Sequence, residues 1–431
     1  MRIQLKSGLS AFVLVGLSTI IWARPVVLIQ TDEIDYQNNI PATDRYWFYK
    51  NIDGTQQNPL VGGGVYNSLE QKIGRSWQIP AVVYVQGSTI TIRLRLKNYY
   101  WNTITGNLEF TDFRLKVPVE PAWREGVGSH RPNITYIDLE PPDSQQVSVA
   151  SGGGTTDVTI SIEGLPDYVT YGDLQFKGQI YATSGYTYGY PVWQFWVDDD
   201  GWSSLGTVYL TDSDPVDLQE APWTDLLEYT CSWAHGESGE ADVRAAITLG
   251  LYWRSRWVYD PGGLYFWVEP SESNNSIQYD LTKALGHLSS VNMDCRDAAG
   301  FNVLAMNSQG HSASPARLFQ YYLDPFRTNF VCGMGNDATS FAYYQQFDFN
   351  FHEVCTATYA YDAACAQWTD LAGSSWRNPP YGWSLGGYWQ TSNGSGGFYG
   401  FVFGQPYSST PTSVTMQAVP ETIQNIYVQG S

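Results

Sequence analysis

Polar and apolar residues alternate with a period of two along much of residues 25–215, which predicts β-strands. Clear examples are residues 88–96 and 157–162, and turn-forming Gly clusters such as 152–154 separate the runs. Regularly spaced short strands with turn signals between them are typical of β-sandwiches. We therefore predict an all-β N-terminal half.

This half is expected to contain one or two β-sandwich modules. A Pro-containing stretch at 118–121 is the candidate boundary, giving a β module over 24–118 and a β-sandwich module over 119–217. The acidic stretch 212–217 resembles a linker to the next domain.

The hydrophobic period changes to that of helices after residue 222. Apolar stripes predict helices over 223–235, 240–252, 278–288 and 294–309. The last of these is apolar on nearly all sides, so we expect it to be buried. It should position whatever chemistry this domain carries.

Strands are expected again after the helices. Residues 316–322 form one, and 349–356 with 359–363 form a tight hairpin. Helices followed by a sheet indicate an α+β core over 222–375, and the Gly/Ser/Trp-rich residues 376–431 suggest a short β-rich tail. The fold class is therefore multi-domain, with β-sandwich module(s), an α+β core and a β-rich tail.

Composition narrows the function classes. The 431 residues include 23 Lys and Arg against 42 Asp and Glu, a formal charge of −19. Nucleic-acid binders and proteins held to anionic lipid need basic surface, so both classes are disfavoured. With 43% hydrophobic residues the chain is core-forming rather than disordered.

The first 23 residues resemble a secretory signal peptide. Arg2 and Lys6 precede an apolar run from about Leu9 to Ile21, and Ala23 offers a cleavage site. An uncleaved membrane anchor is the alternative. We expect a secreted or cell-surface protein with no membrane span after cleavage.

Five cysteines lie between residues 231 and 365. Outside the cytosol cysteines tend to pair, and an odd count leaves at least one thiol over. Cys231, Cys332, Cys355 and Cys365 fit two disulfides whose pairing stays open, with Cys355–Cys365 the pair expected nearest in space.

Cys295 has the setting expected of the unpaired thiol. It opens the buried helix, and Asp294 and Asp297 have the spacing of a capping box. The helix dipole at this end favours thiolate over thiol, and a thiolate is the nucleophile of acyl transfer. An inert buried or disulfide-bonded cysteine is the alternative.

His352 and Asp362 complete a candidate Cys-His-Asp triad. They lie ten residues apart across the expected hairpin. A turn near residue 357 would place them opposite each other on one face. Asp362 could then hold one imidazole nitrogen and leave the other for Cys295. A half-buried strand histidine and a turn-flanking carboxylate are the structural alternatives.

These residues resemble the transglutaminase-like superfamily, in its bacterial secreted form. The segments that carry the likeness are 292–299, with Cys295 opening the helix, then 314–318, His352-Glu353-Val354 and Tyr361-Asp362-Ala363. The resemblance covers about residues 222–372. The short hairpin departs from many members and leaves Asp370 as an alternative to Asp362.

The resemblance implies a papain-like core that forms a Cys295 thioester with a protein carboxamide, assisted by His352. An amine or water then releases the acyl group, giving cross-linking, deamidation or proteolysis. It implies no cofactor and no metal, and a protein or peptide substrate, with the cell envelope as one candidate source. Nucleic acid is not an expected partner, and the oligomeric state stays open.

Other functions compete with this one. A non-catalytic adhesion or scaffold protein could keep the papain-like fold as a structural module. Cys231 and His235 have helical spacing for two metal ligands, although two ligands do not make a site. The aromatic-rich tail, including Trp383 and Trp389, would bind glycans only if its rings were exposed.

Overall fold

The computed structural model describes the parts of the chain on which all structural statements below rest. They are residues 29–37, 46–51, 60–61, 66–67, 78–118, 134–186, 191–194, 202–216, 224–255, 257–261, 267–268, 276–279, 281–286, 291–320, 326–327, 331–336, 341–349, 351–357, 359–367, 414–418 and 422–425. The expected signal peptide, the aromatic segment of the tail and Asp370 lie outside them.

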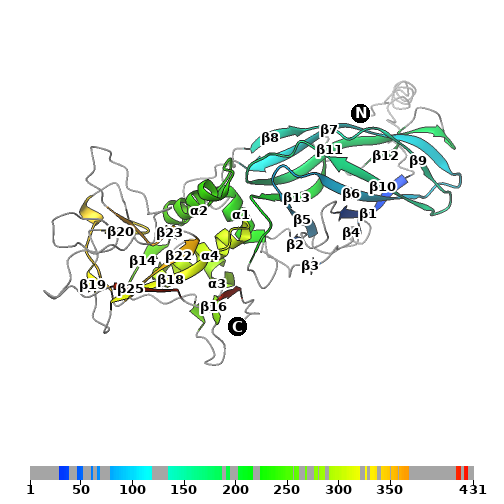
Figure 1. Ribbon diagram of the computed structural model, residues 1–431. Helices are drawn as coiled ribbons and strands as arrows, with labels where there is room; N and C mark the ends of the chain where they lie inside the picture. The colour runs from blue at the N-terminus through cyan, green and yellow to red at the C-terminus, as the bar shows by residue number, and fades with distance from the viewer. Residues whose placement is uncertain are drawn as a thin grey trace, which may run out of the picture.

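The described N-terminal half is all β, as predicted, and its strands join in one 13-stranded sheet (Figure 1). The strands are β1 (Ile29–Gln37), β2 (Tyr46–Asn51), β3 (Leu60–Val61), β4 (Tyr66–Asn67), β5 (Gln78–Val85), β6 (Ile90–Asn98), β7 (Ile104–Pro118), β8 (Ile134–Leu139), β9 (Gln145–Val149), β10 (Thr155–Ile162), β11 (Thr170–Ser184), β12 (Pro191–Gln194) and β13 (Ser203–Thr211).

Alternation along these strands separates the core from the solvent. In β10, Val158, Ile160 and Ile162 are buried while the residues between them are exposed. This is the period-two pattern that places one side of a strand against the core. Most buried side chains of the module form one hydrophobic cluster, which is consistent with a β-sandwich, while Val83, Val169 and Tyr209 join the core of the helical domain.

Strands from both sides of residue 118 belong to this sheet. The pairs β6–β10 and β7–β11 join them, the second over eleven residue pairs from Asp173↔Lys116 to Ser184↔Thr105. A division into modules 24–118 and 119–217 stays a prediction. What the structure adds is that the strands on both sides of the proposed boundary share one core.

Helices appear where the period changed. They are α1 (Thr224–Trp233), α2 (Glu240–Arg254), α3 (Leu281–Gly286) and α4 (Cys295–Ser308). The predicted helices over 223–235, 240–252 and 294–309 are confirmed. The third is shorter than expected, because residues Ser276–Tyr279 form strand β16 instead.

The strands of this second domain fall into several small sheets. The largest has the order β23–β22–β18–β25. The strands are β14 (Val258–Tyr259), β15 (Trp267–Val268), β16, β17 (Asn292–Met293), β18 (Ser314–Gln320), β19 (Phe326–Arg327), β20 (Val331–Gly333), β21 (Asp348–Phe349), β22 (Phe351–Ala357), β23 (Tyr359–Tyr361), β24 (Cys365–Gln367), β25 (Val414–Ala418) and β26 (Thr422–Asn425). The predicted hairpin is β22–β23.

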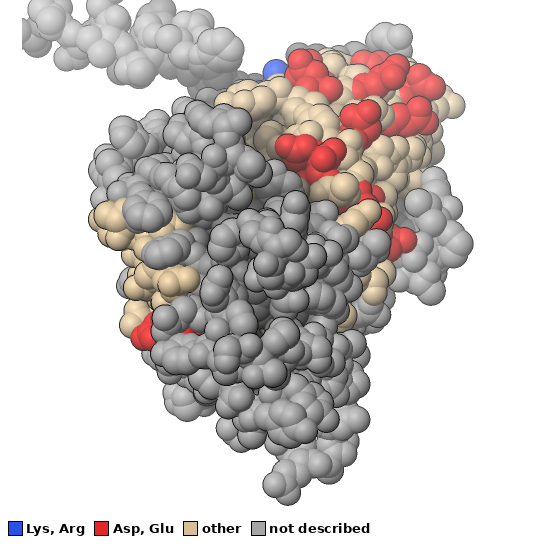
Figure 2. All heavy atoms as spheres, turned by 60° about the vertical axis from the view of Figure 1, so that its left-hand side comes forward, with Lys and Arg blue, Asp and Glu red and all other residues tan. Residues whose placement is uncertain are grey.

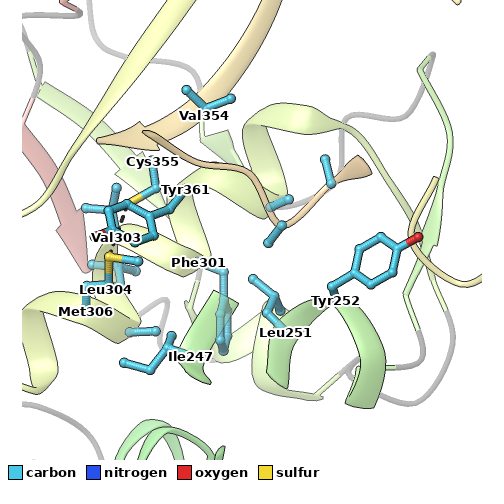
Figure 3. Packing of buried hydrophobic residues seen from close by; sticks show 14 of the residues in the cluster. Ile247, Leu251, Tyr252, Phe301, Val303, Leu304, Met306, Val354, Cys355 and Tyr361 are labelled. Atoms are coloured by element: carbon cyan, nitrogen blue, oxygen red, sulfur yellow. Dashed lines mark hydrogen bonds between the residues drawn. The ribbon is translucent and has the colours of Figure 1, made fainter. Parts of the chain in front are cut away.

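Helix α4 is the centre of this domain. Every residue from Asp297 to Ser308 is buried, as its apolar composition predicted. It packs against α1, α2 and strand β22. Figure 3 shows Phe301 facing Leu251 of α2, and Met306 facing Cys355 of β22. These contacts with α1, α2 and β22 hold the helix, and with it Cys295 in its first turn, in one position.

Hydrogen bonds join the β module to the helical domain. Asp212, just after β13, accepts from Gln86 Nε2 at 2.7 Å and from the backbone N–H of Gly239 at 2.8 Å. The backbone N–H of Ser213 donates to Gln309, just after α4. Gly310 has φ of +85° and so turns the chain beneath Ser213, where a Cβ atom would clash. The segment expected to be a linker is therefore in contact with both domains.

Acidic side chains gather on one face of the molecule. Figure 2 shows Asp and Glu side chains gathered over the upper described part of one face. This agrees with the formal charge of −19. Within the described ranges, no helix has both the length and the apolar character needed to cross a bilayer.

Candidate active site

Cys295 is the first residue of α4, and the predicted capping box is formed. The Asp294 side chain accepts hydrogen bonds from the N–H groups of Arg296 and Asp297, at 2.9 Å and 3.0 Å. In return Asp297 accepts from the N–H of Asp294 at 3.2 Å. This arrangement satisfies three of the four N–H groups at the start of the helix and does not involve the N–H of Cys295.

The Cys295 thiol is buried, with only 5% of the residue exposed. Burial raises its pKa well above the ordinary value, and the Asp294 and Glu353 carboxylates raise it further. A hydrogen bond from the Glu353 backbone N–H acts in the opposite direction. The expectation of a resting thiolate is therefore wrong, because desolvation outweighs the helix dipole here. The resting form is the neutral thiol.

The same hydrogen bond places Cys295 beside strand β22. Glu353 follows His352 directly in that strand, and β22 packs against α4. The two candidate residues therefore come from adjoining elements of one core, as the sequence order required.

His352 and Asp362 form a hydrogen bond, with 2.9 Å between His352 Nε2 and Asp362 Oδ2. The expected geometry was slightly different. In the hairpin Cys355 pairs with Tyr361, the last residue of β23, and Asp362 comes directly after it. Asp362 therefore lies diagonally across from His352 and not directly opposite it. The even spacing still places both side chains on one face. Asp362 Oδ1 accepts from the Ala364 N–H at 2.8 Å, which fixes the carboxylate.

The other imidazole nitrogen of His352, Nδ1, is buried and has no hydrogen-bond partner among the described residues. A carboxylate only accepts hydrogen bonds, so Asp362 selects the tautomer with the proton on Nε2. Nδ1 is then the basic nitrogen. The ring is held flat against Phe349, with centroids 5.0 Å apart and planes 6° apart.

Tyr259 is a residue of this site that the sequence did not reveal. Strand β14 pairs in parallel with β17, so that Tyr259 lies beside Met293, two residues before Cys295. Its hydroxyl is buried and lacks a hydrogen-bond partner of good geometry among the described residues, and the Cys365 thiol is the neighbour that it contacts. Burial raises the phenol pKa, with smaller effects from Cys365 and then Cys295. The phenol is therefore a protonated donor near the thiol.

Gly333 explains how Tyr259 reaches this place. A Cβ atom at Gly333 would lie 2.8 Å from the Cβ of Tyr259. Only glycine lets β14 and β20 come this close. The signal in the sequence was one Gly in a three-residue strand, which cannot be interpreted without knowing what packs on it.

The expected disulfides are not formed. All five cysteines are buried within the described residues, and none of them is in a disulfide. Cys355 contacts the Met306 thioether at 3.5 Å, whereas Cys365 lies opposite Gly333 in a different sheet. The predicted Cys355–Cys365 pair is therefore wrong, because each of the two cysteines has a different neighbour.

Metal ligation finds no support within the described part of the chain. No group of three or more His, Cys, Asp or Glu side chains there is arranged to hold a metal. Cys231 lies near the Gln309 amide at 3.4 Å, while His235 Nδ1 lies 2.9 Å from the Thr170 hydroxyl. The two candidate ligands thus have different partners.

Comparisons with known proteins add little. No protein-family model matches the sequence, and no curated protein matches it. One similar solved structure is a family 123 glycoside hydrolase from Clostridium perfringens, described in connection with glycolipid glycan hydrolysis. It is 10% identical, with a TM-score of 0.16, over 34% of this chain and 27% of that chain. The chain thus spans well under half of that enzyme, and so weak a likeness carries no argument.

Proposed function

We propose that the chain is a secreted or cell-surface thiol enzyme of transglutaminase-like type, acting on protein carboxamides through a thioester on Cys295. One observation carries the proposal. Asp362 binds Nε2 of the buried His352 imidazole, while Nδ1 has no partner among the described residues. His352 lies in strand β22, and the backbone of the next residue in that strand, Glu353, donates to the Cys295 thiol. A cysteine nucleophile needs a base that a third group orients, and the free nitrogen of His352 supports that role. A hydrogen bond between this nitrogen and the Cys295 thiol is part of the proposal.

The chemistry follows from the resting protonation states. As the thiol attacks the carboxamide carbon, its proton passes to His352 Nδ1, and the carbonyl oxygen gains negative charge. The Cys295 N–H and the Tyr259 hydroxyl are the donors proposed for that oxyanion. Collapse of the tetrahedral intermediate breaks the C–N bond, and the proton on Nδ1 leaves with ammonia.

A second nucleophile then releases the acyl group. An amine gives a new amide bond, and water gives a carboxylic acid. In either case His352 takes the incoming proton and returns it to the Cys295 sulfur. The raised pKa of the Cys295 thiol fits this cycle. The thiol stays protonated at rest and gives its proton to His352 only as the sulfur bonds to the substrate carbon.

A hydroxamate assay tests the proposal. The purified chain is incubated with benzyloxycarbonyl-Gln-Gly and hydroxylamine, and ammonia release without hydroxylamine is measured in parallel. We expect Cys295→Ser to lose at least a hundredfold in rate. Cys231→Ser is the matched control, since Cys231 is an equally buried helical thiol with a pKa near 12.

The burial of Cys295 favours one alternative, the non-catalytic scaffold. A thiol that is 5% exposed leaves little room for a substrate in this conformation. Alkylation by iodoacetamide, mapped by mass spectrometry, separates the two functions. Labelling of Cys295 before the other four thiols supports the enzyme. Equal protection of all five, together with no turnover, would establish the scaffold.

A further inference from the structure

The end of the β module far from the candidate active site carries an exposed aromatic group. It is made by the loop between β6 and β7, where Trp101 is 75% exposed and Tyr99 is 49% exposed. Strand β11 starts beside the helical domain at Thr170 and ends at Ser184, next to this loop. At about 3.3 Å per residue its length is roughly 45 Å, so the two ends of the module are well separated (Figure 1).

The loop is held in place by a buried amide. The side-chain nitrogen of Asn98 donates to the carbonyls of Asn102 and Val149, at 2.8 Å and 3.0 Å. Its side-chain oxygen accepts from the Tyr100 N–H at 2.8 Å. Three of the four hydrogen bonds open to an Asn side chain are therefore used to shape this loop. These bonds fix the backbone of the loop that carries the exposed rings.

A neighbouring loop supports the first from below. The N–H of Gly152 donates to the Tyr100 carbonyl at 2.9 Å, and the N–H of Gly153 donates to the Asn98 carbonyl at 2.8 Å. Both glycines have positive φ, at +63° and +91°, which lets the chain turn under the aromatic loop. Two loops are thus joined into one rigid tip.

The rings are packed as a group rather than scattered. Trp101 lies on Tyr100 with ring centroids 4.0 Å apart, and Tyr100 meets Tyr186 edge-on at 5.5 Å. Exposing a large aromatic surface to water is unfavourable, and patches of this kind commonly mark interaction sites. Backing by two further rings fixes the orientation of the Trp101 face before anything binds.

The surroundings of these rings indicate the kind of ligand. Residues 98–106 and 149–156 contain no charged side chain, in a chain with 42 acidic residues. Lys97 borders them, and its ammonium lies 5.4 Å from the centroid of the Tyr99 ring. The exposed residues beside the rings are instead small and polar, namely Asn102, Thr103 and Ser151. Around Trp101 the surface consists of ring faces, amides and hydroxyls, which complement an uncharged ligand with apolar C–H faces and many hydroxyls.

We propose that this tip is a binding site for a neutral polysaccharide built of flat hexopyranose units. Such sugars place their C–H bonds on one face, which packs on the Trp101 and Tyr99 rings, and their hydroxyls at the edge, where amides and hydroxyls bind them. A bilayer surface is the competing ligand for exposed Trp and Tyr. It fits less well, because the tip offers no aliphatic wedge and the chain is strongly acidic.

Binding to defined polysaccharides tests the site. The Cys295→Ser chain is used, so that the outcome does not depend on the proposed enzymatic activity. Calorimetric titration with cellohexaose, chitohexaose and laminarihexaose is combined with depletion onto insoluble cellulose and chitin. We expect saturable binding to at least one of these, at least a tenfold loss in Trp101→Ala and a smaller loss in Tyr99→Ala.

Trp253→Ala is the matched control, since Trp253 is also exposed but lies at the end of α2. It should bind like the parent chain, and unchanged melting temperatures would show that every variant is folded. Absence of saturable binding to all the sugars, or equal binding by Trp101→Ala, would overturn the proposal. So would Trp101-dependent binding to phosphatidylcholine vesicles without any binding to the sugars.

Discussion

His352 Nε2 and Asp362 Oδ2 lie 2.9 Å apart, and each side chain is only 1% exposed. A hydrogen bond shielded from water in this way fixes both the orientation of the imidazole and the nitrogen that carries its proton. For the proposed thiol chemistry the consequence is specific, because the opposite nitrogen is the one available as the base.

Asp362→Asn should therefore abolish most activity without unfolding the protein. The amide oxygen can still accept from the Ala364 N–H, but the amide N–H₂ turned to His352 donates and so forces the proton onto Nδ1. We expect kcat in the hydroxamate assay to fall by roughly 10²–10⁴-fold. Asp157→Asn, on the surface of the β module, should leave kcat unchanged. A variant of Asp362 with normal kcat would assign the role elsewhere, with Asp370 the next candidate.

Tyr259→Phe should separate catalysis from stability. Its hydroxyl is buried without a good hydrogen bond, so removing it should leave the free energy of unfolding unchanged or raise it by up to about 1 kcal/mol. If the hydroxyl stabilises the oxyanion, kcat should fall by roughly 10–10³-fold. Rates and urea midpoints are measured on the same preparations.

Tyr252→Phe is the contrasting variant. The Tyr252 hydroxyl is also buried, but it donates to the Cys332 carbonyl at 3.0 Å. Its loss should destabilise the fold by about 1 kcal/mol and leave kcat unchanged. If Tyr259→Phe and Tyr252→Phe changed kcat and the free energy of unfolding by similar amounts, the catalytic role proposed for Tyr259 would be wrong.

Local patterns were sufficient to predict much of this fold. The buried helix α4 could be located because Asp294 and Asp297 mark its start and Gly310 follows its end, all within a few residues. The ten-residue spacing of His352 and Asp362 likewise placed them on one face of a hairpin. Helix caps and strand spacing depend on residues that are close in sequence, so they can be predicted from the sequence alone.

Non-local contacts account for what was missed. Tyr259 joins the site only because β14 pairs with β17 and because Gly333 admits its side chain. The protonation state of Cys295 depends on burial by several elements, which a dipole argument on one helix does not include. The cysteine pairs were wrong for the same reason, since contacts between distant elements decide which residue lies beside each thiol.

Arg244 is expected to stabilise the β22–β23 hairpin. This side chain is 5% exposed, and its Nη1 donates to the Ala357 carbonyl at the hairpin turn, at 3.0 Å. Its guanidinium also lies over the ring of Tyr361, 6.0 Å from the centroid. Arg244→Met would leave that carbonyl buried and unsatisfied, so the free energy of unfolding should fall by roughly 1–3 kcal/mol in urea titrations.

Glu240→Gln tests which contact of Arg244 matters. Glu240 pairs with Arg244 one helical turn away but is 60% exposed. Solvent screens such a pair, so its loss should change the free energy of unfolding by less than about 0.5 kcal/mol. A larger effect in Glu240→Gln than in Arg244→Met would show that the ion pair, and not the bond to Ala357, is the stabilising contact.

His311 should make the joint between the two domains sensitive to acid. Its ring is buried, with Nε2 3.4 Å from Asp212 Oδ2, and Asp212 also accepts from Gln86 and Gly239. Burial lowers the His311 pKa to about 4, Asp212 opposes that shift, and Arg244 adds to it. In the unfolded chain the pKa of a histidine is about 6.5.

Protonation therefore favours the unfolded chain between these two values. Above about pH 6.5 the histidine is neutral in both states and stability does not depend on it. As pH falls toward 4, the unfolded chain takes up the proton first, and up to roughly 3 kcal/mol should be lost. His311→Gln should remove this slope when unfolding free energies are measured from pH 8 to pH 4. The same slope in wild type and variant would show that His311 is not the group that responds.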